Sequence, residues 1–218
     1  MENPNRRWVV VMEQYEKYDI DYSRNLPPTN DFLANRNTLF EKSIKELRLH
    51  NGDRILEIGC DKGNFVLYLQ KKFGKDNVFG IDLNKEAISA AKIQNLLYMD
   101  ALHTTFSNGY FTKIFSFHTI EHIPDLSAFF KEVDRILAPG GICVMGYPAE
   151  PIRGLFSVRM AMKYYGNPLL ARKIHVHKLY PRKLRKFVMG TSLRIVKSKL
   201  IFALLPQFYT VLSKPSTI

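Results

Sequence analysis

The sequence predicts a single α/β domain built on a doubly wound, mostly parallel sheet of seven strands. From residue 51 onward, short apolar runs alternate with segments of helical periodicity, which is the pattern of βαβ units. Two more strand-like runs follow the last predicted helix. The length of 218 residues fits one domain with a sizeable core and would be cramped for two.

The first half of the predicted sheet comes from three apolar runs. RILEIG (54–59) is typical of a buried parallel strand, and the helix after it stops near Gly74. NVFGIDL (77–83) predicts a second strand. Asn84 can cap the next helix, because its side chain can accept a hydrogen bond from a free backbone N–H. The weaker run NLLYM (95–99) predicts a short third strand.

The second half follows the same alternation. KIFSFH (113–118) predicts a fourth strand, and Asp125 is placed to cap a helix whose apolar residues recur at helical spacing. The Pro-Gly-Gly sequence at 139–141 predicts a turn before GICVMGY (141–147), the fifth strand. The two last strands, within 191–218, are expected to form an antiparallel closing hairpin.

The whole chain, 1–218, is expected to be one domain with four parts. Two basic helices are predicted in the third part, at 152–165 and 181–190. The parts are an N-terminal helical extension (1–48), a cofactor-binding core (49–148), a basic substrate or lid region (149–190) and closing strands (191–218).

Positive charge is concentrated at the C-terminal end of the sequence. Residues 151–218 hold 14 of the 32 Lys and Arg residues and no Asp or Glu, although the chain has 20 acids. Such asymmetry points to an anionic partner, which can be a phosphorylated substrate, an anionic membrane surface or nucleic acid. The alternative is a basic face that is simply solvated.

Cysteine usage and hydropathy predict a cytoplasmic protein. Cys60 and Cys143 are too few and too far apart for a disulfide framework, which fits a reducing compartment. The basic N-terminal residues precede a short apolar run, but acids and Gln follow that run at once and no cleavage-like site of small residues is present, so no signal peptide is expected. The longest apolar stretch, 200–212, is interrupted by Pro206 and falls short of the roughly 20 residues that span a bilayer. Any membrane contact would be peripheral, at the inner face.

Two motifs indicate a nucleoside-containing cofactor. In ILEIGCDKGNF, Gly59 lets the backbone turn tightly and Gly63 allows close packing where the next helix begins, so the helix N-terminus can receive an anionic group. The spacing G-x-x-x-G differs from the G-x-G-x-x-G of nicotinamide sites. Asp82, at the end of the second strand, can accept hydrogen bonds from both ribose hydroxyls.

As a set, the motifs between about residue 50 and 148 resemble the class I S-adenosylmethionine-dependent methyltransferases of the small-molecule type. ILEIGCDKG resembles the family's first motif and GIDLNKEAISAAK its second. MDALHTTFSNGYFTKIFSFHTIEHIPD and LAPGGICVMGYP resemble the later ones. The resemblance implies a Rossmann-like fold, S-adenosyl-L-methionine as cofactor and S-adenosyl-L-homocysteine as product.

The resemblance also implies which residues contact each part of the cofactor. Asp61 departs from the pattern, because it stands where the family usually has a glycine; it would repel the cofactor carboxylate unless it turns toward the ammonium group or caps the helix. The implied contacts are Glu57, Gly59, Cys60 and Gly63 at the methionine end, Asp82 and Leu83 at the ribose and adenine, Asp100 and Ala101 at the adenine amine, and Phe117 and His118 under the sulfonium.

Catalysis needs few groups, because the sulfonium already activates the methyl carbon. His118, Glu121 and His122 follow the fourth strand, at the ligand-binding edge of such sheets. They either shape the pocket or include a general base, which would be His122 or His118. No metal is expected: His175 and His177 have a spacing that suits ligation, but their segment offers no further cysteine or acid.

The predicted function is methyl transfer to an oxygen or nitrogen of a small or lipid-like acceptor, expected to be anionic. An RNA or other nucleic-acid methyltransferase is the first alternative, favoured by the basic C-terminal region with its interleaved aromatic residues. It is weakened because no N-P-P-Y or D-P-P-Y tetrapeptide follows the fourth strand. A cofactor-binding interaction protein without catalysis is the second alternative. The oligomeric state is not predicted.

Overall fold

The computed structural model describes most of the expected core and parts of the flanking regions. The described residues are 41, 43–149, 158, 161–162, 166–170, 175–201 and 206–216. The strands are β1 (Ile55–Ile58), β2 (Val78–Asp82), β3 (Leu96–Tyr98), β4 (Phe111–Phe117), β5 (Leu137–Pro148), β6 (Arg194–Ile201) and β7 (Gln207–Ser213). The helices are α3 (Asn64–Phe73), α4 (Lys85–Ala91), α5 (Leu126–Ile136) and α8 (Pro181–Val188), with a short 3-10 helix, η1, at Pro168–Leu170.

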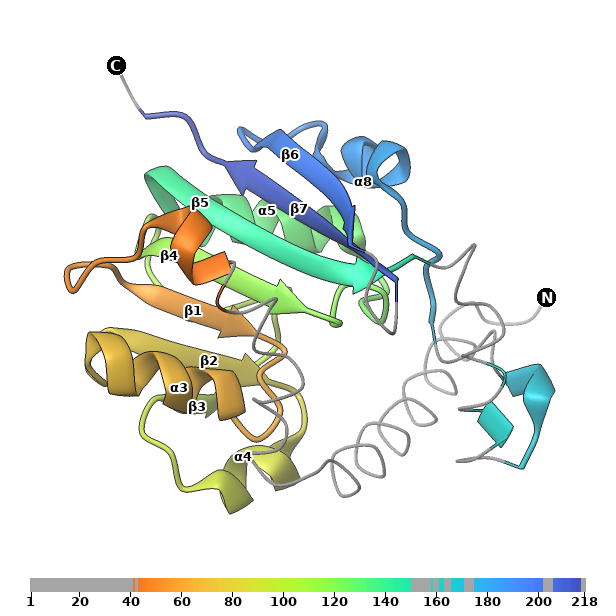
Figure 1. Ribbon diagram of the computed structural model, residues 1–218, viewed down its shortest axis with the longest axis horizontal. Coiled ribbons are helices and arrows are strands. Elements are labelled where there is room, and N and C mark those ends of the chain that lie inside the picture. Colours follow the sequence, from red (N-terminus) through yellow and green to blue (C-terminus); the bar gives the residue numbers. More distant parts are fainter. Residues whose placement is uncertain are drawn as a thin grey trace.

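The seven strands form one sheet in the order β3-β2-β1-β4-β5-β7-β6 (Figure 1). The pairs β1–β2, β1–β4, β2–β3 and β4–β5 are parallel. β7 runs antiparallel to both β5 and β6, so the last two strands form the closing hairpin expected from the sequence. The predicted doubly wound, mostly parallel α/β fold is confirmed.

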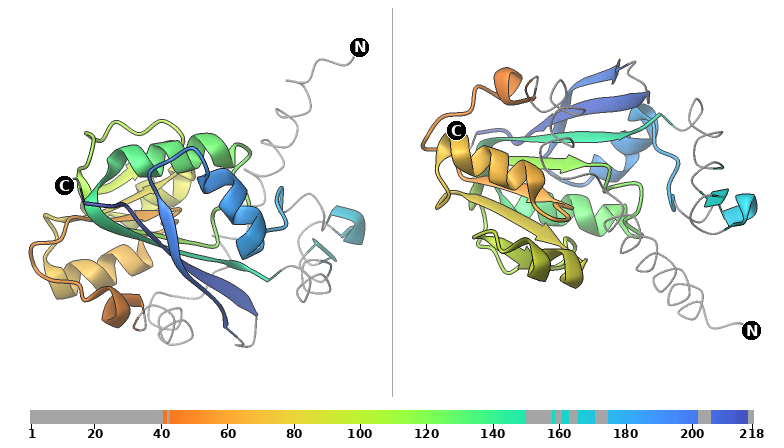
Figure 2. Two further views of the ribbon diagram at one scale, coloured as in Figure 1. Left: turned by 90° about the horizontal axis from the view of Figure 1, so that it is seen from above. Right: turned by 60° about the horizontal axis from the view of Figure 1, so that its bottom comes forward.

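Helices cover both faces of the sheet. α3 lies on one face, whereas α5 and α8 lie on the other (Figure 2). Successive residues of β1 alternate between the two sides: Leu56 and Ile58 join the core cluster with α5 and α8, and Ile55 joins the cluster with α3. Both faces of the central strands are therefore buried, which explains why their sequences are continuous apolar runs.

Two predicted helix caps are present. The Asn84 side chain accepts a hydrogen bond of 3.0 Å from the backbone N–H of Ala87 at the start of α4. The Asp125 side chain accepts one of 2.9 Å from Ala128 at the start of α5. Each bond satisfies a backbone donor that a helix start leaves without an intrahelical partner.

The turn predicted at 139–141 does not separate α5 from the fifth strand. β5 already begins at Leu137, which pairs with Phe111, and the next pair joins Ile142 to Lys113. Residues 138–141 therefore bulge out of β5 opposite the single residue Thr112. The prediction was wrong because the Pro-Gly-Gly sequence permits a bulge inside a strand as well as a turn between elements.

Much of the predicted N-terminal extension and lid lies outside the described residues. Residues 41 and 43–47 are helical, and Ile44 and Leu47 pack in the cluster on the α3 face. The helix predicted at 152–165 lies mostly outside the described part, and the division of the chain into four parts stays a prediction. No helix among the described residues is both long and apolar enough to cross a bilayer.

Both cysteine thiols are expected to be unreactive in the folded protein. Burial raises the pKa of the Cys143 thiol, and burial together with the nearby charges of Asp82, Glu57 and Asp61 raises that of Cys60. Because the thiolate is the reactive form, Ellman's reagent should modify neither cysteine at neutral pH and both of them in guanidinium chloride. Rapid modification of the native protein would contradict this arrangement.

Candidate functional site

A pocket opens at the carboxyl edge of the sheet, beyond the ends of β1, β2 and β4. The space between its lining residues measures about 710 Å³ when the open solvent at its mouth is included. This is the crevice in which open α/β sheets bind ligands. Six of the predicted site residues line it: Gly59, Asp82, Leu83, Asp100, Ala101 and His122.

The turn from β1 into α3 requires glycine at two positions. Gly59 has a φ of +79°, and a Cβ there would lie 2.0 Å from Thr119 Oγ1. Gly63 has a φ of +71°, and a Cβ there would lie 2.5 Å from the Leu96 side chain. Gly63 offers no side-chain cap to α3, and the first turn of α3 contains no acid. The helix N-terminus therefore presents backbone N–H groups to an anion.

Asp82, the last residue of β2, accepts hydrogen bonds from the glycine turn and from the residues that follow β2. Its Oδ2 accepts a 2.7 Å hydrogen bond from the Asp61 N–H, and its Oδ1 accepts one of 2.8 Å from the Asn84 N–H. Burial raises the pKa of the Asp82 carboxyl above its ordinary value, and the charge of Asp61 adds to this effect; hydrogen bonds from the backbone N–H groups of Asn84, Asp61 and Leu83 oppose it but do not cancel it. A carboxylate has about four acceptor positions, so acceptor capacity remains at Asp82 for a ribose hydroxyl.

The backbone explains the unusual residue at position 61. Asp61 has a φ of +46°, in the left-handed region where glycine is most at ease. Aspartate tolerates this conformation better than most residues do. The turn therefore has the backbone conformation that a glycine would adopt at position 61, and the Asp61 N–H donates a hydrogen bond to Asp82.

Several predicted cofactor residues do not line the pocket within the described part of the chain. Cys60 lies in the core cluster on the α3 face, and the Phe117 ring packs edge-on against Phe65 with a centroid distance of 5.7 Å. Glu57 is buried within β1. The contacts that the resemblance implies for these residues, and for Gly63 and Asp61, stay predictions.

Several residues that line the pocket were not predicted from the sequence. Thr119 lines it, and its Oγ1 donates to the Ile58 carbonyl at 3.2 Å. Met99, Ile123 and Pro124 add apolar surface. Thr119, Ile123 and Pro124 belong to the HTIEHIP segment already singled out for its histidines, so a wider interpretation of that motif would have found them.

The predicted catalytic residues lie close together in the loop after β4, and His122 also lines the pocket. Glu121 Oε1 lies 3.5 Å from His118 Nδ1 and 3.9 Å from His122 Nε2. Burial alone would raise the pKa of Glu121, but the hydrogen bond with His118 and the charges of His122, His118 and His175 outweigh it and lower the pKa to about 2. Glu121 is therefore an ionised, buried carboxylate surrounded by imidazoles.

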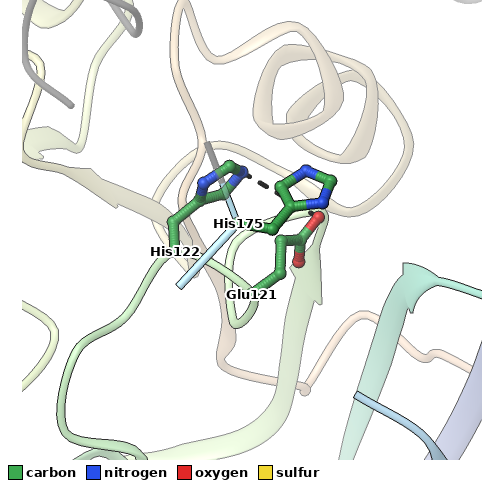
Figure 3. A group of neighbouring side chains, drawn as sticks. All are labelled: Glu121, His122 and His175. Atoms are coloured by element: carbon green, nitrogen blue, oxygen red, sulfur yellow. Dashed lines mark ion pairs between the residues drawn. The ribbon is translucent and has the colours of Figure 1, made fainter. Parts of the chain in front are cut away.

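The fold adds His175 to this cluster. Figure 3 shows its ring beside that of His122. The two rings pack edge-on, with a centroid distance of 5.1 Å. The neighbouring His177 holds the segment in place, because its N–H donates to the Glu121 carbonyl and its Nε2 lies 3.1 Å from the Pro124 carbonyl oxygen. His118 has a φ of +57°, a rare conformation that is often found at functional sites.

The sheet, the glycine turn and the acid at the end of β2 together define a class I S-adenosylmethionine-dependent methyltransferase domain. Comparison with known proteins agrees. Residues 32–197 match the family described as a methyltransferase domain. Since this is more than half of the chain, the protein belongs to that family. The identification made from the sequence motifs is confirmed, and with it S-adenosylmethionine as the cofactor of the class.

Individual relatives are more distant. The chain is 36% identical over 111 residues to tocopherol O-methyltransferase of Arabidopsis thaliana, covering 46% of this chain and 29% of that protein. It is 27% identical over 178 residues to demethylmenaquinone methyltransferase of Lactobacillus johnsonii, covering 74% and 72%. The crystal structure of a SAM-dependent methyltransferase from Methanosarcina mazei matches 80% of this chain and 98% of its own, with 19% identity and a TM-score of 0.63. The chain thus spans less than a third of the plant enzyme.

Proposed function

We propose that the protein transfers the methyl group of S-adenosylmethionine to an oxygen or nitrogen of a small, lipid-like acceptor. The observation that carries this proposal is the pocket itself, which combines Gly59, Asp82 and Asp100 with a wall of apolar side chains and His122. The names of the two relatives, a tocopherol and a demethylmenaquinone methyltransferase, support an acceptor of this kind. The cytoplasmic location expected from the sequence belongs to the same proposal.

The arrangement suits an in-line transfer. The start of α3 would hold the cofactor carboxylate, Asp82 the ribose, and Leu83, Asp100 and Ala101 the adenine. The sulfonium, which supplies the activated methyl group, would then face the loop after β4. The acceptor atom forms a bond to the methyl carbon as the carbon–sulfur bond breaks, which leaves neutral S-adenosylhomocysteine. The acceptor's proton passes to an imidazole of the cluster, that of His118 or His122.

The basic C-terminal region supports an anionic acceptor or contact with an anionic membrane surface. α8 buries Leu184 and Val188 against the core and leaves Arg182, Arg185 and Lys186 exposed. Two other lysines of this region form ion pairs with acids of the core, Lys197 with Glu46 and Lys214 with Asp134. α8 therefore presents three exposed positive charges close together.

A transfer assay tests the proposed function. With tritium in the methyl group of S-adenosylmethionine, label should pass to phenolic or quinol lipids and not to RNA. The rate should fall much less steeply with salt than that of a protein that contacts many phosphates. Label in RNA with a rate that falls steeply as salt rises would favour a nucleic-acid methyltransferase. Cofactor binding by calorimetry without transfer to any acceptor class would favour an interaction protein.

A further inference from the structure

Glu121, His122 and His175 bring three potential metal ligands to one point beside the pocket. One ligand atom of each residue lies within 4.8 Å of those of the other two. Figure 3 shows the carboxylate and the two rings converging, with the dashed line marking the ion pair between His122 and Glu121. Two of the residues come from the loop after β4, and the third comes from the segment that precedes α8.

We propose that these three side chains bind a divalent transition-metal ion of the zinc type. Two imidazoles and one carboxylate are an established zinc ligand set, and imidazole ligands favour zinc over magnesium. At bond lengths of about 2.0–2.2 Å, the ligand atoms of a tetrahedral site lie about 3.4 Å apart. His122 Nε2 and Glu121 Oε1 are 3.9 Å apart and all three ligand atoms lie within 4.8 Å, so side-chain rotation must bring them closer when an ion binds.

A second observation points to a cation at this place. The side chain of Glu121 is 1% exposed, and its Oε2 has no hydrogen-bond partner among the described residues. A buried carboxylate oxygen without a partner is costly, and a metal ion would satisfy it. The site is also preassembled, since the two bonds of His177 to the loop after β4 hold His175 against His122.

This proposal reverses the expectation drawn from the sequence, which predicted no metal because the segment of His175 and His177 contains no acid. The fold supplies the acid from Glu121, more than 50 residues earlier in the chain. Three protein ligands leave one zinc position open, and His122 lines the pocket. The ion would then polarise an acceptor oxygen, with His122 as a ligand and His118 as the proton acceptor.

Metal binding can be measured without cofactor or acceptor, so the test is independent of the proposed function. The protein is prepared without a histidine tag, treated with a chelator and titrated with Zn²⁺ by calorimetry. Co²⁺ is used in parallel, because its visible absorption reports tetrahedral coordination by protein ligands. We expect one Zn²⁺ per chain, and no displacement by excess Mg²⁺.

Variants identify the ligands. Glu121→Gln, which keeps the side-chain shape, and His175→Ala should each weaken Zn²⁺ binding by at least about 100-fold, since even the loss of an indirect partner costs 10–100-fold. His103→Ala is the matched control, because His103 is exposed and lies outside the cluster, and it should bind as the unmodified protein does. Circular dichroism checks the fold of each variant, and His175→Ala keeps the test valid if Glu121→Gln does not fold. Absence of stoichiometric binding, or equal binding by all variants, would overturn the proposal and leave an ion-paired cluster only.

Discussion

Replacing Asp82 by Asn is expected to reduce the affinity for S-adenosylmethionine by about 100-fold or more. Hydrogen bonds to a charged group contribute about 1.5–3 kcal/mol each, and the substitution would weaken the bonds predicted between Asp82 and the ribose hydroxyls. The new amide group would also face the backbone N–H of Asp61 or Asn84, which now donate to Asp82 Oδ2 and Oδ1. Calorimetric titration with the cofactor and with S-adenosylhomocysteine measures the loss.

Asp76→Asn provides the control for this variant. Asp76 is exposed, shortly before β2, and its Oδ1 accepts a 3.5 Å hydrogen bond from the Gln94 side chain. Its replacement should leave cofactor affinity unchanged. If Asp82→Asn bound the cofactor as tightly as the unmodified protein, the ribose assignment would be wrong. Thermal unfolding of both variants separates the loss of a ligand contact from loosening of the glycine turn.

The second large effect is expected from Gly59→Ala. The new Cβ would lie 2.0 Å from Thr119 Oγ1, and the left-handed backbone adds about 1–2 kcal/mol of strain for a residue with a side chain. We expect a total destabilisation of about 2–3 kcal/mol, which lowers the melting temperature by about 5–10 °C in a protein of this size. Cofactor binding should be lost as well, because Gly59 and Thr119 both line the pocket.

Gly52→Ala is the matched control. A Cβ at Gly52 would have no heavy atom within 4 Å, and its φ does not lie in the left-handed region. This variant should melt within a degree or two of the unmodified protein and bind the cofactor normally. Equal destabilisation by both alanines, followed by scanning calorimetry, would refute the close contact between the turn and Thr119.

Local features of the fold were predictable because their causes are local. Asn84 and Asp125 cap helices through bonds to residues three positions later, which a sequence shows directly. The bulge in β5 was not predictable, since it depends on how Phe111 and Leu137 align across two strands. The order in which β7 enters between β5 and β6 is likewise a property of the assembled sheet.

In the candidate site, too, the features with a local cause were predictable from the sequence, and those that depend on distant packing were not. Gly59, Asp82 and Asp100 follow strand ends, so their places at the carboxyl edge follow from the parallel sheet. Side-chain direction was harder to predict: the Phe117 ring belongs to the core on the α3 face. His175 joins Glu121 and His122 through the packing of a distant segment, and neither its spacing nor its neighbours in the sequence indicate that contact.

The position of β7 has a consequence for how the protein folds. β6 is the edge strand and pairs with β7 alone among the described strands. β7 pairs in turn with β5, although the paired residues, such as Val144 and Val211, are far apart in the sequence. Such distant pairings form slowly, because a large loop must close before any contact compensates for the lost chain entropy. This edge of the molecule should therefore assemble last and in one step, and damage to β7 should detach two strands at once.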